Sequence, residues 1–170
     1  KASGISGIAL PHEDFARNST YAIYGQATWR PEFLTGVSLT LGGRYTWDKR
    51  DATNYLGLHG KLSSENFSPS LVINYEPRPN VNLYAKMATG YKAGGFNVRQ
   101  ADFTTGFSPE KLTTYEVGWK TEWFDRRLRW NTALFYSDYK NIQLDILVPD
   151  QPDPALTITK NAGKAKIAGV

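Results

Sequence analysis

The sequence predicts an all-β chain that forms an antiparallel, up-and-down transmembrane β-barrel meander. Apolar and polar residues alternate with a period of two in six segments, which is the side-chain period of a β-strand. The composition of 10 Tyr, 5 Trp and 15 Gly, with one Met and no Cys, favours sheets and turns over helices. Short and long connections alternate between the segments, as they do in outer-membrane barrels.

The six predicted strands cover residues 20–30, 37–48, 67–76, 81–92, 113–123 and 127–139. The short connections are 31–36, 77–80 and 124–127, and the long connections are 49–66, 93–112 and 140–156. Apolar residues alternate from 142 to 148, so we expect the sixth strand to continue past the membrane until Pro149 breaks it. We expect a seventh strand to begin near Leu156.

Charged residues occupy only one face of the predicted strands. The uncharged face consists of the odd-numbered residues of the first five segments and the even-numbered residues 128–136 of the sixth, although 21% of the chain is charged. Each Lys or Arg facing lipid at the bilayer midplane would cost about 2 to 4 kcal/mol, so the uncharged face is predicted to contact lipid. The opposite face carries Arg30, Arg44, Asp48, Glu76, Lys86, Lys92, Glu116, Lys120, Glu122 and Arg129.

Aromatic residues lie at both ends of the uncharged face and predict two membrane girdles, because amphipathic rings favour the lipid headgroup level. Trp29, Tyr75, Trp123 and Trp130 are next to the short turns, and Tyr21, Trp47, Phe67, Tyr91, Tyr115 and Tyr136 are at the opposite ends. A soluble β-sandwich also alternates, but its core could not hold so many charges without pairing them. A barrel with a wet or plugged lumen is therefore favoured over a soluble all-β binding module.

One turn permits a register prediction. Asp125 and Arg126 can form a two-residue hairpin loop with Phe124 opposite Arg127. In this register the two residue numbers of each cross-strand pair add up to 251. The prediction places Glu122 opposite Arg129 on the lumen side, and Tyr115 opposite Tyr136, Val117 opposite Leu134 and Trp123 opposite Leu128 on the outer side.

Several short motifs follow one another in an order that resembles the barrel of TonB-dependent receptors. They are YGQATW at 24–29, LGGRYT at 41–46, SPSL at 68–71, LYA at 83–85, GYKAGGFN at 90–97, FSPE at 107–110, YEVGWK at 115–120, NTALFY at 131–136 and NAGKA at 161–165. The resemblance implies that residues 1–170 are about seven strands from the later part of a 22-stranded barrel. We expect the N-terminal plug domain and the C-terminal closing strand to lie outside this chain.

The resemblance also implies a function and a location. TonB-dependent receptors of the bacterial outer membrane bind scarce nutrient complexes, such as ferric siderophores, and import them with energy delivered through TonB. The expected partners are outer-membrane lipid, the protein's own plug domain, the TonB complex reached through the missing N-terminal region, and the ligand. A passive porin-type channel is the alternative within the same architecture.

The candidate ligand-binding residues come from the lumen charges and from the loop after residue 92, which combines cations, hydrogen-bond donors and aromatic rings. They are Arg44, Lys86, Tyr91, Lys92, Phe96, Asn97, Arg99 and Phe103. The alternative interpretation is a solvated loop, and for Arg44, Lys86 and Lys92 contact with the plug.

The sequence does not predict an enzyme, a metal site or a cofactor. His12 and His59 lack metal-ligand spacing, and Glu116 and Glu122 are predicted to pair with lumen cations. Basic residues are dispersed along the chain rather than gathered in one stripe, so we expect no nucleic-acid partner.

Overall fold

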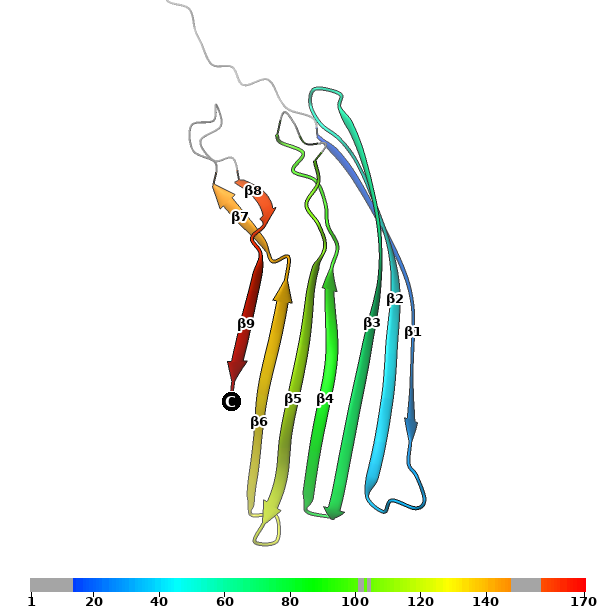
Figure 1. Ribbon diagram of the computed structural model, residues 1–170, viewed down its shortest axis with the longest axis vertical. Helices are drawn as coiled ribbons and strands as arrows, with labels where there is room; N and C mark the ends of the chain where they lie inside the picture. The colour runs from blue at the N-terminus through cyan, green and yellow to red at the C-terminus, as the bar shows by residue number, and fades with distance from the viewer. Residues whose placement is uncertain (1–13, 101–102, 104, 148–156) are drawn as a thin grey trace, which may run out of the picture.

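The main feature of the computed structural model, which describes residues 14–100, 103, 105–147 and 157–170, is an open antiparallel sheet of seven strands. The sheet order is β1-β2-β3-β4-β5-β6-β9, so consecutive strands are neighbours throughout except for the inserted β7–β8 hairpin (Figure 1). The predicted up-and-down meander is confirmed. The strands are β1 (Phe15–Trp29), β2 (Val37–Thr53), β3 (His59–Arg78), β4 (Val81–Lys92), β5 (Glu110–Trp123), β6 (Leu128–Lys140), β7 (Gln143–Leu147), β8 (Thr157–Asn161) and β9 (Lys164–Gly169).

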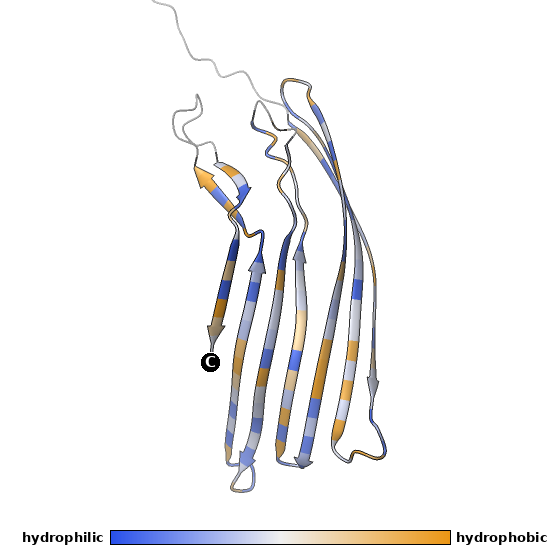
Figure 2. Cartoon of the chain, viewed as in Figure 1, coloured by the Kyte–Doolittle hydropathy of each residue, from blue (hydrophilic) through white to orange (hydrophobic). Residues whose placement is uncertain are grey.

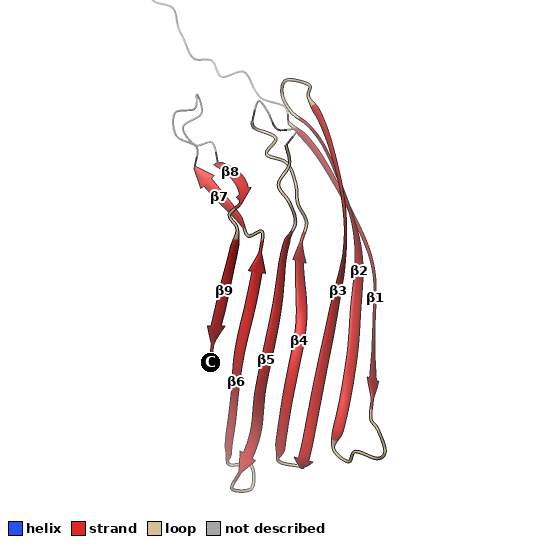
Figure 3. Ribbon diagram, viewed as in Figure 1, coloured by secondary structure: helices blue, strands red, loops and turns tan. Residues whose placement is uncertain are grey.

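The described residues form strands and connecting loops only (Figure 3). None of them belongs to a helix long and apolar enough to cross a membrane. The β1–β2, β3–β4 and β5–β6 turns lie together at one end of the sheet, and the β2–β3, β4–β5 and β6–β9 connections lie at the other end, which we call the loop end (Figure 1).

The prediction of a long loop at 49–66 is wrong. β2 and β3 stay paired up to Thr53 and His59, which leaves only residues 54–58 as the connection. Apolar alternation stops near residue 48, but cross-strand charge pairs continue the ladder: Asp51 lies 3.3 Å from His59 and 3.8 Å from Lys61. Beyond the lipid, both faces of a hairpin can be polar, so its hydropathy no longer reveals the strands.

The predicted continuation of β6 is also wrong. Asn141 has a φ of +54°, a left-handed conformation that turns the chain out of the β6 direction. β7 then pairs with β8 in a separate two-stranded sheet, and the main sheet resumes only at Lys164, after Gly163 with a φ of +101°. Leu156, where the seventh strand was expected to begin, lies outside the described residues.

The β5–β6 hairpin has the predicted register. Trp123 pairs with Leu128 and Glu122 with Arg129, and the Arg127 amide donates a hydrogen bond of 3.1 Å to the Phe124 carbonyl. Asp125 and Arg126 have φ values of +51° and +67°, as the central residues of a type I′ turn require.

The registers bring the uncharged positions of neighbouring strands onto one face of the sheet. Leu41, for example, lies between Ala27 and Leu71, and Val117 pairs with Leu134. Hydrophobic and hydrophilic residues alternate along each strand (Figure 2). Leu41 is 56% exposed and Ile23 is 66% exposed, whereas the buried hydrophobic residues among those described are only Ala52, Phe103 and Ile158. The described sheet therefore has almost no apolar core of its own.

Candidate ligand-binding site

A pocket forms on the charged face where β3 and β4 separate. Pairing between these two strands ends at Ser70 and Ala88, although β3 continues beside β2 and β4 continues beside β5. The resulting hollow has a volume of about 450 Å³ and lies toward the loop end. The charged and aromatic side chains that line it are Arg44, Asp48, Arg50 and Tyr91.

Asp48 is the fixed acidic centre of this pocket. The side chain is 3% exposed, and its Oδ1 accepts hydrogen bonds from Thr20 at 2.6 Å and from Arg50 Nη2 at 3.2 Å. Arg50 also donates through Nε to the Gly94 carbonyl at 3.4 Å, so it ties the loop after β4 to β2. The positive charge of Arg50 is thus balanced by a buried carboxylate.

Arg44 is the cation in the pocket that remains available. It is exposed, and its Nε donates to the Thr46 hydroxyl at 3.2 Å. Among the described residues, Arg44 has no acidic partner within ion-pair distance. The pocket therefore presents one uncompensated guanidinium, a group whose planar donors suit carboxylate and other anionic oxygens.

Tyr91 is placed differently from the prediction that it belongs to the outer aromatic girdle. Its ring is half-buried, and its hydroxyl lies 2.8 Å from the Ser64 hydroxyl, on the charged side of β3. At the height of Tyr91, β3 is no longer paired with β4, so the ring enters the gap between the strands instead of standing on the uncharged face. This position places Tyr91 in the same pocket as Arg44.

The loop after β4 is held together by aromatic packing. Phe96 and Phe103 meet edge to face with ring centroids 5.7 Å apart, and both rings lie close to Gly60 of β3. Phe103 is fully buried, so in this arrangement it anchors the loop and presents no surface to a ligand. Arg99 remains exposed beside a smaller hollow of about 260 Å³ that Phe96 and Ile158 also line.

Two asparagine side chains connect this loop to β8. Asn97 donates to the Thr159 carbonyl at 2.9 Å and accepts from the Thr159 amide at 2.7 Å. Asn161 makes the same pair of bonds to Ser108, at 2.9 and 2.7 Å. The polar atoms of Asn97 are therefore occupied by the backbone, and the β7–β8 hairpin is held against the loop after β4.

Lys86 and Lys92 lie outside the pocket. Lys86 is opposite Glu116, which accepts a 2.6 Å hydrogen bond from the Tyr84 hydroxyl, and Lys92 is opposite Glu110. The structure brings Arg44 and Tyr91 together, whereas Phe96, Asn97, Arg99 and Phe103 belong to the neighbouring loop. Sequence reasoning did not select Arg50 as a ligand-site residue, because it fell in the supposed 49–66 loop; continuing the alternation from Asp48 would have found it.

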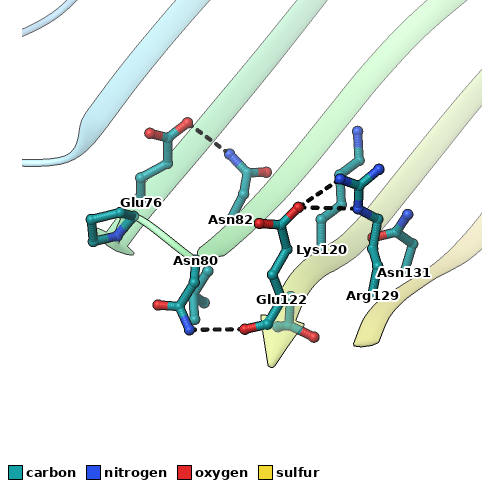
Figure 4. Close-up of a pocket in the computed structure, with 10 residues that line it drawn as sticks. Glu76, Asn80, Asn82, Lys120, Glu122, Arg129 and Asn131 are labelled. Atoms are coloured by element: carbon teal, nitrogen blue, oxygen red, sulfur yellow. Dashed lines mark hydrogen bonds and ion pairs between the residues drawn. The ribbon is translucent and has the colours of Figure 1, made fainter. Parts of the chain in front are cut away.

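A second polar hollow of about 400 Å³ lies on the charged face near the short turns (Figure 4). Arg129 donates to Glu122 Oε1 from Nη2 at 2.7 Å and from Nε at 3.1 Å, which confirms the predicted cross-strand pair. Asn82 donates to Glu76 at 3.1 Å. Glu122 is thus held in a structural ion pair at the short-turn end of the charged face.

The other predicted girdle residues are exposed on the uncharged face. Leu128 and Leu134 accompany them on β6, and Ile23 and Leu41 on β1 and β2. The exposed aromatic residues at girdle positions are Tyr21, Trp29, Trp47, Phe67, Tyr75, Tyr115, Trp123, Trp130 and Tyr136.

Comparison with known proteins identifies similar sequences. The pesticin receptor of Yersinia pestis is 31% identical over 173 residues, a region that covers 95% of this chain and 24% of that protein. The probable TonB-dependent siderophore receptor PiuA of Acinetobacter baumannii is 28% identical over 145 residues, covering 77% of this chain and 18% of that protein. The chain thus spans about a quarter or less of the length of these relatives.

Solved structures share the fold. The ferric yersiniabactin uptake receptor FyuA from Yersinia pestis matches with a TM-score of 0.71 and 24% identity, covering 93% of this chain and 24% of that one. The alcaligin outer membrane receptor FauA from Bordetella pertussis matches with a TM-score of 0.63 and 20% identity, covering 92% and 27%. The family model described as TonB dependent receptor-like, beta-barrel matches residues 9–170. Because that match covers nearly the whole chain, the chain belongs to the β-barrel family of TonB-dependent receptors.

Proposed function

We propose that this chain is one sector of the barrel wall of a bacterial outer-membrane receptor that actively imports a scarce nutrient complex, most specifically a ferric siderophore. The observation that carries the proposal is the pocket at the loop end, where Arg44 has no acidic partner among the described residues. An iron chelate rich in anionic oxygens would be attracted to this guanidinium. The names of the relatives, which include a siderophore receptor and a ferric yersiniabactin uptake receptor, support the same ligand class.

The arrangement of the pocket supports binding without covalent chemistry. Asp48 and Arg50 form an ion pair in the lining, Arg44 supplies charge, and the half-buried ring of Tyr91 supplies a flat surface. Arg99 extends the basic surface along the neighbouring loop, while Phe96, Asn97 and Phe103 hold that loop in place. In this proposal Phe103 and Asn97 position the site and do not contact the ligand.

The remaining lumen groups are assigned to the plug domain of the full-length receptor. Lys86, Lys92 and the Glu122–Arg129 pair lie on the charged face, outside the Arg44 pocket. Energy from the TonB complex would enter through a segment beyond residues 1–170, so no residue of this chain is assigned to coupling.

Replacement of Arg44 tests the ligand site in the full-length receptor. Arg44→Gln should weaken binding of the ferric siderophore by about 10- to 100-fold, because a hydrogen bond to a charged group contributes about 1.5 to 3 kcal/mol. Arg30→Gln removes the same charge from the short-turn end and should leave affinity unchanged. Binding is measured by fluorescence titration, with surface expression checked for each variant. Equal affinities for the two variants would contradict the site.

Growth and conductance measurements test the transport class. Deleting the full gene should impair growth when iron is supplied only as one particular chelate. Normal growth on every chelate tested would show that the imported nutrient is not an iron chelate. It would not contradict the assignment to the TonB-dependent receptors. A passive porin, in contrast, would conduct ions steadily across a planar bilayer without an energy source.

A further inference from the structure

Three lysines lie side by side on the outer face of the sheet, where the strands leave the lipid level. Lys111 of β5 pairs with Lys140 of β6, and Lys140 pairs with Lys164 of β9. All three continue the uncharged face, since they have the parity of Tyr115, Tyr136 and Ala168. We call these three residues the lysine row. Directly paired side chains have Cβ atoms only about 5 Å apart, so the row concentrates positive charge at one height.

Little negative charge compensates this row. One step closer to the girdle, Asp138 lies opposite Lys166 in the strand register, and its carboxylate is 3.6 Å from the ammonium group of Lys140. Asp138 is the only acid among the outward positions of β5, β6 and β9, all of which are described. Within the described residues, Lys111, Lys164 and Lys166 have no ion-pair partner. Like charges directly opposite one another destabilise a sheet. An anion bound from outside the chain would reduce this repulsion.

The corresponding region of β1, β2 and β3 provides a contrast. There Arg17, Asp51 and Lys61 form one row across three strands, with the acid in the middle position. Asp51 lies 3.8 Å from Lys61 and 3.3 Å from His59. With two cations and one acid this row has a net charge of +1, whereas the three residues of the lysine row carry +3, so positive charge is concentrated on β5, β6 and β9.

The height of the lysine row matches the headgroup layer. Lys111 is four residues beyond Tyr115, which is about 13 Å along the strand and about 10 Å along the membrane normal at a tilt near 40°. Lys166 is two residues beyond the Tyr136–Ala168 pair and lies closer to the girdle. A bilayer adds several ångströms of headgroup region to each side of its hydrocarbon core. Flexible lysine stems can therefore place their ammonium groups among the headgroups.

We propose that the lysine row, together with Lys166, binds the phosphate groups of an anionic lipid in the leaflet that surrounds the loop end. The occupant is a lipid because the row continues the girdle of Tyr115 and Tyr136 on the same face, so acyl chains can lie below while phosphates meet the ammonium groups. β5, β6 and β9 lie side by side (Figure 1), and hydrophilic segments occupy the loop ends of β5 and β9 (Figure 2). The inference rests on the membrane placement in the proposed function and is independent of the imported ligand.

The test compares lipid binding by variants of the full-length receptor purified in neutral detergent. Native mass spectrometry measures the affinity for phosphatidic acid, which carries a phosphate monoester, and for zwitterionic phosphatidylcholine. The combined variant Lys111→Gln, Lys140→Gln and Lys164→Gln should lose about 10- to 100-fold in affinity for phosphatidic acid, because each basic residue near an anionic lipid surface contributes about 1 kcal/mol. The control Lys86→Gln, Lys92→Gln and Lys120→Gln removes the same charge from the lumen face and should bind as wild type does.

Two further measurements separate binding from folding. The Lys-to-Arg variant of the row should retain the affinity, and the Gln variant should unfold at no lower temperature than wild type in neutral detergent, since repulsion is removed. The proposal is overturned if wild type shows no preference for phosphatidic acid, or if the row and lumen variants lose affinity equally. A receptor that still imports its ligand without this preference would refute the lipid site alone.

Discussion

Adjacent residues on β2 face different surroundings. Leu41 is 56% exposed on the uncharged face, between Ala27 and Leu71. Thr40 points to the opposite face, where its hydroxyl lies 2.8 Å from that of Thr28. The two positions differ by one step along the strand and therefore compare lipid with lumen at the same height.

Arginine substitutions at these two positions should have unequal effects in the full-length receptor. Leu41→Arg should lower the free energy of unfolding by about 2 to 4 kcal/mol, because it places a charge in lipid near the bilayer midplane. Thr40→Arg should cost less, since an Arg in a polar lumen can be hydrated. Urea titration of the protein refolded into lipid vesicles measures both. A greater loss for Thr40→Arg would reverse the assignment of the two faces.

Single residues also mark where sequence reasoning succeeds and fails. Alternation places Leu41 correctly because all neighbouring strands are paired at its height. The same alternation places Tyr91 on the wrong face. The Tyr91 ring enters the gap between β3 and β4, and the separation of these strands depends on tertiary structure. Phe103 was selected for its aromatic chemistry, and its burial depends on Phe96 and Gly60, which are distant from one another in sequence.

At the scale of elements, the β5–β6 turn has the register that the sequence predicts, but its residues adopt unfavourable backbone conformations. Phe124, Asp125 and Arg126 all have positive φ, at +53°, +51° and +67°. Asp tolerates this region better than Phe or Arg, which lack a short polar side chain. Arg126 is 83% exposed at its side chain and lies 3.4 Å from Glu122, so its ion pair contributes little.

Arg126→Gly should therefore stabilise the full-length receptor by about 1 kcal/mol, the order of the cost of a left-handed conformation for a non-glycine residue. Arg127→Gly is the matched control, because Arg127 is outside the positive-φ residues of the described chain and gains no such relief. The midpoint of urea unfolding in vesicles reports both changes. If Arg126→Gly were no more stable than wild type, the turn would be free of the inferred strain.

Elements beyond the lipid level were the least predictable. Inside the membrane, burial against lipid forces strict alternation, and the strands between the girdles were located from it. Outside, β2 and β3 extend through the Asp51 charge pairs, and β7 turns away at Asn141. Both features depend on polar and backbone interactions, which leave no periodic hydropathy signal.

At the scale of the whole molecule, the sheet exposes its apolar side chains where a soluble protein of this size would bury them. Few described hydrophobic residues are buried, and within β1–β6 every exposed large hydrophobic residue except Tyr24 lies on the same face. For such a sheet, contact of the apolar side chains with lipid takes the place of burial in a protein core. The fold class was predictable for this reason, since lipid contact imposes a pattern along each strand that needs no knowledge of tertiary packing.

Bilayer thickness gives the final prediction, because it moves the lipid boundary along β2. Tyr45 lies toward the outer girdle, and its hydroxyl donates to Glu65 at 2.6 Å, whereas Leu41 lies between the girdles. In thin bilayers, Tyr45→Arg should cost about 0 to 1 kcal/mol, as charges near the interface do. In thicker bilayers its penalty should rise toward that of Leu41→Arg, since lipid then covers more of the strand.

Refolding of the full-length receptor into vesicles with shorter and longer acyl chains measures both penalties. Equal penalties at Tyr45 and Leu41 in every bilayer, or folding of the wild type in plain buffer, would contradict the membrane placement of this sheet.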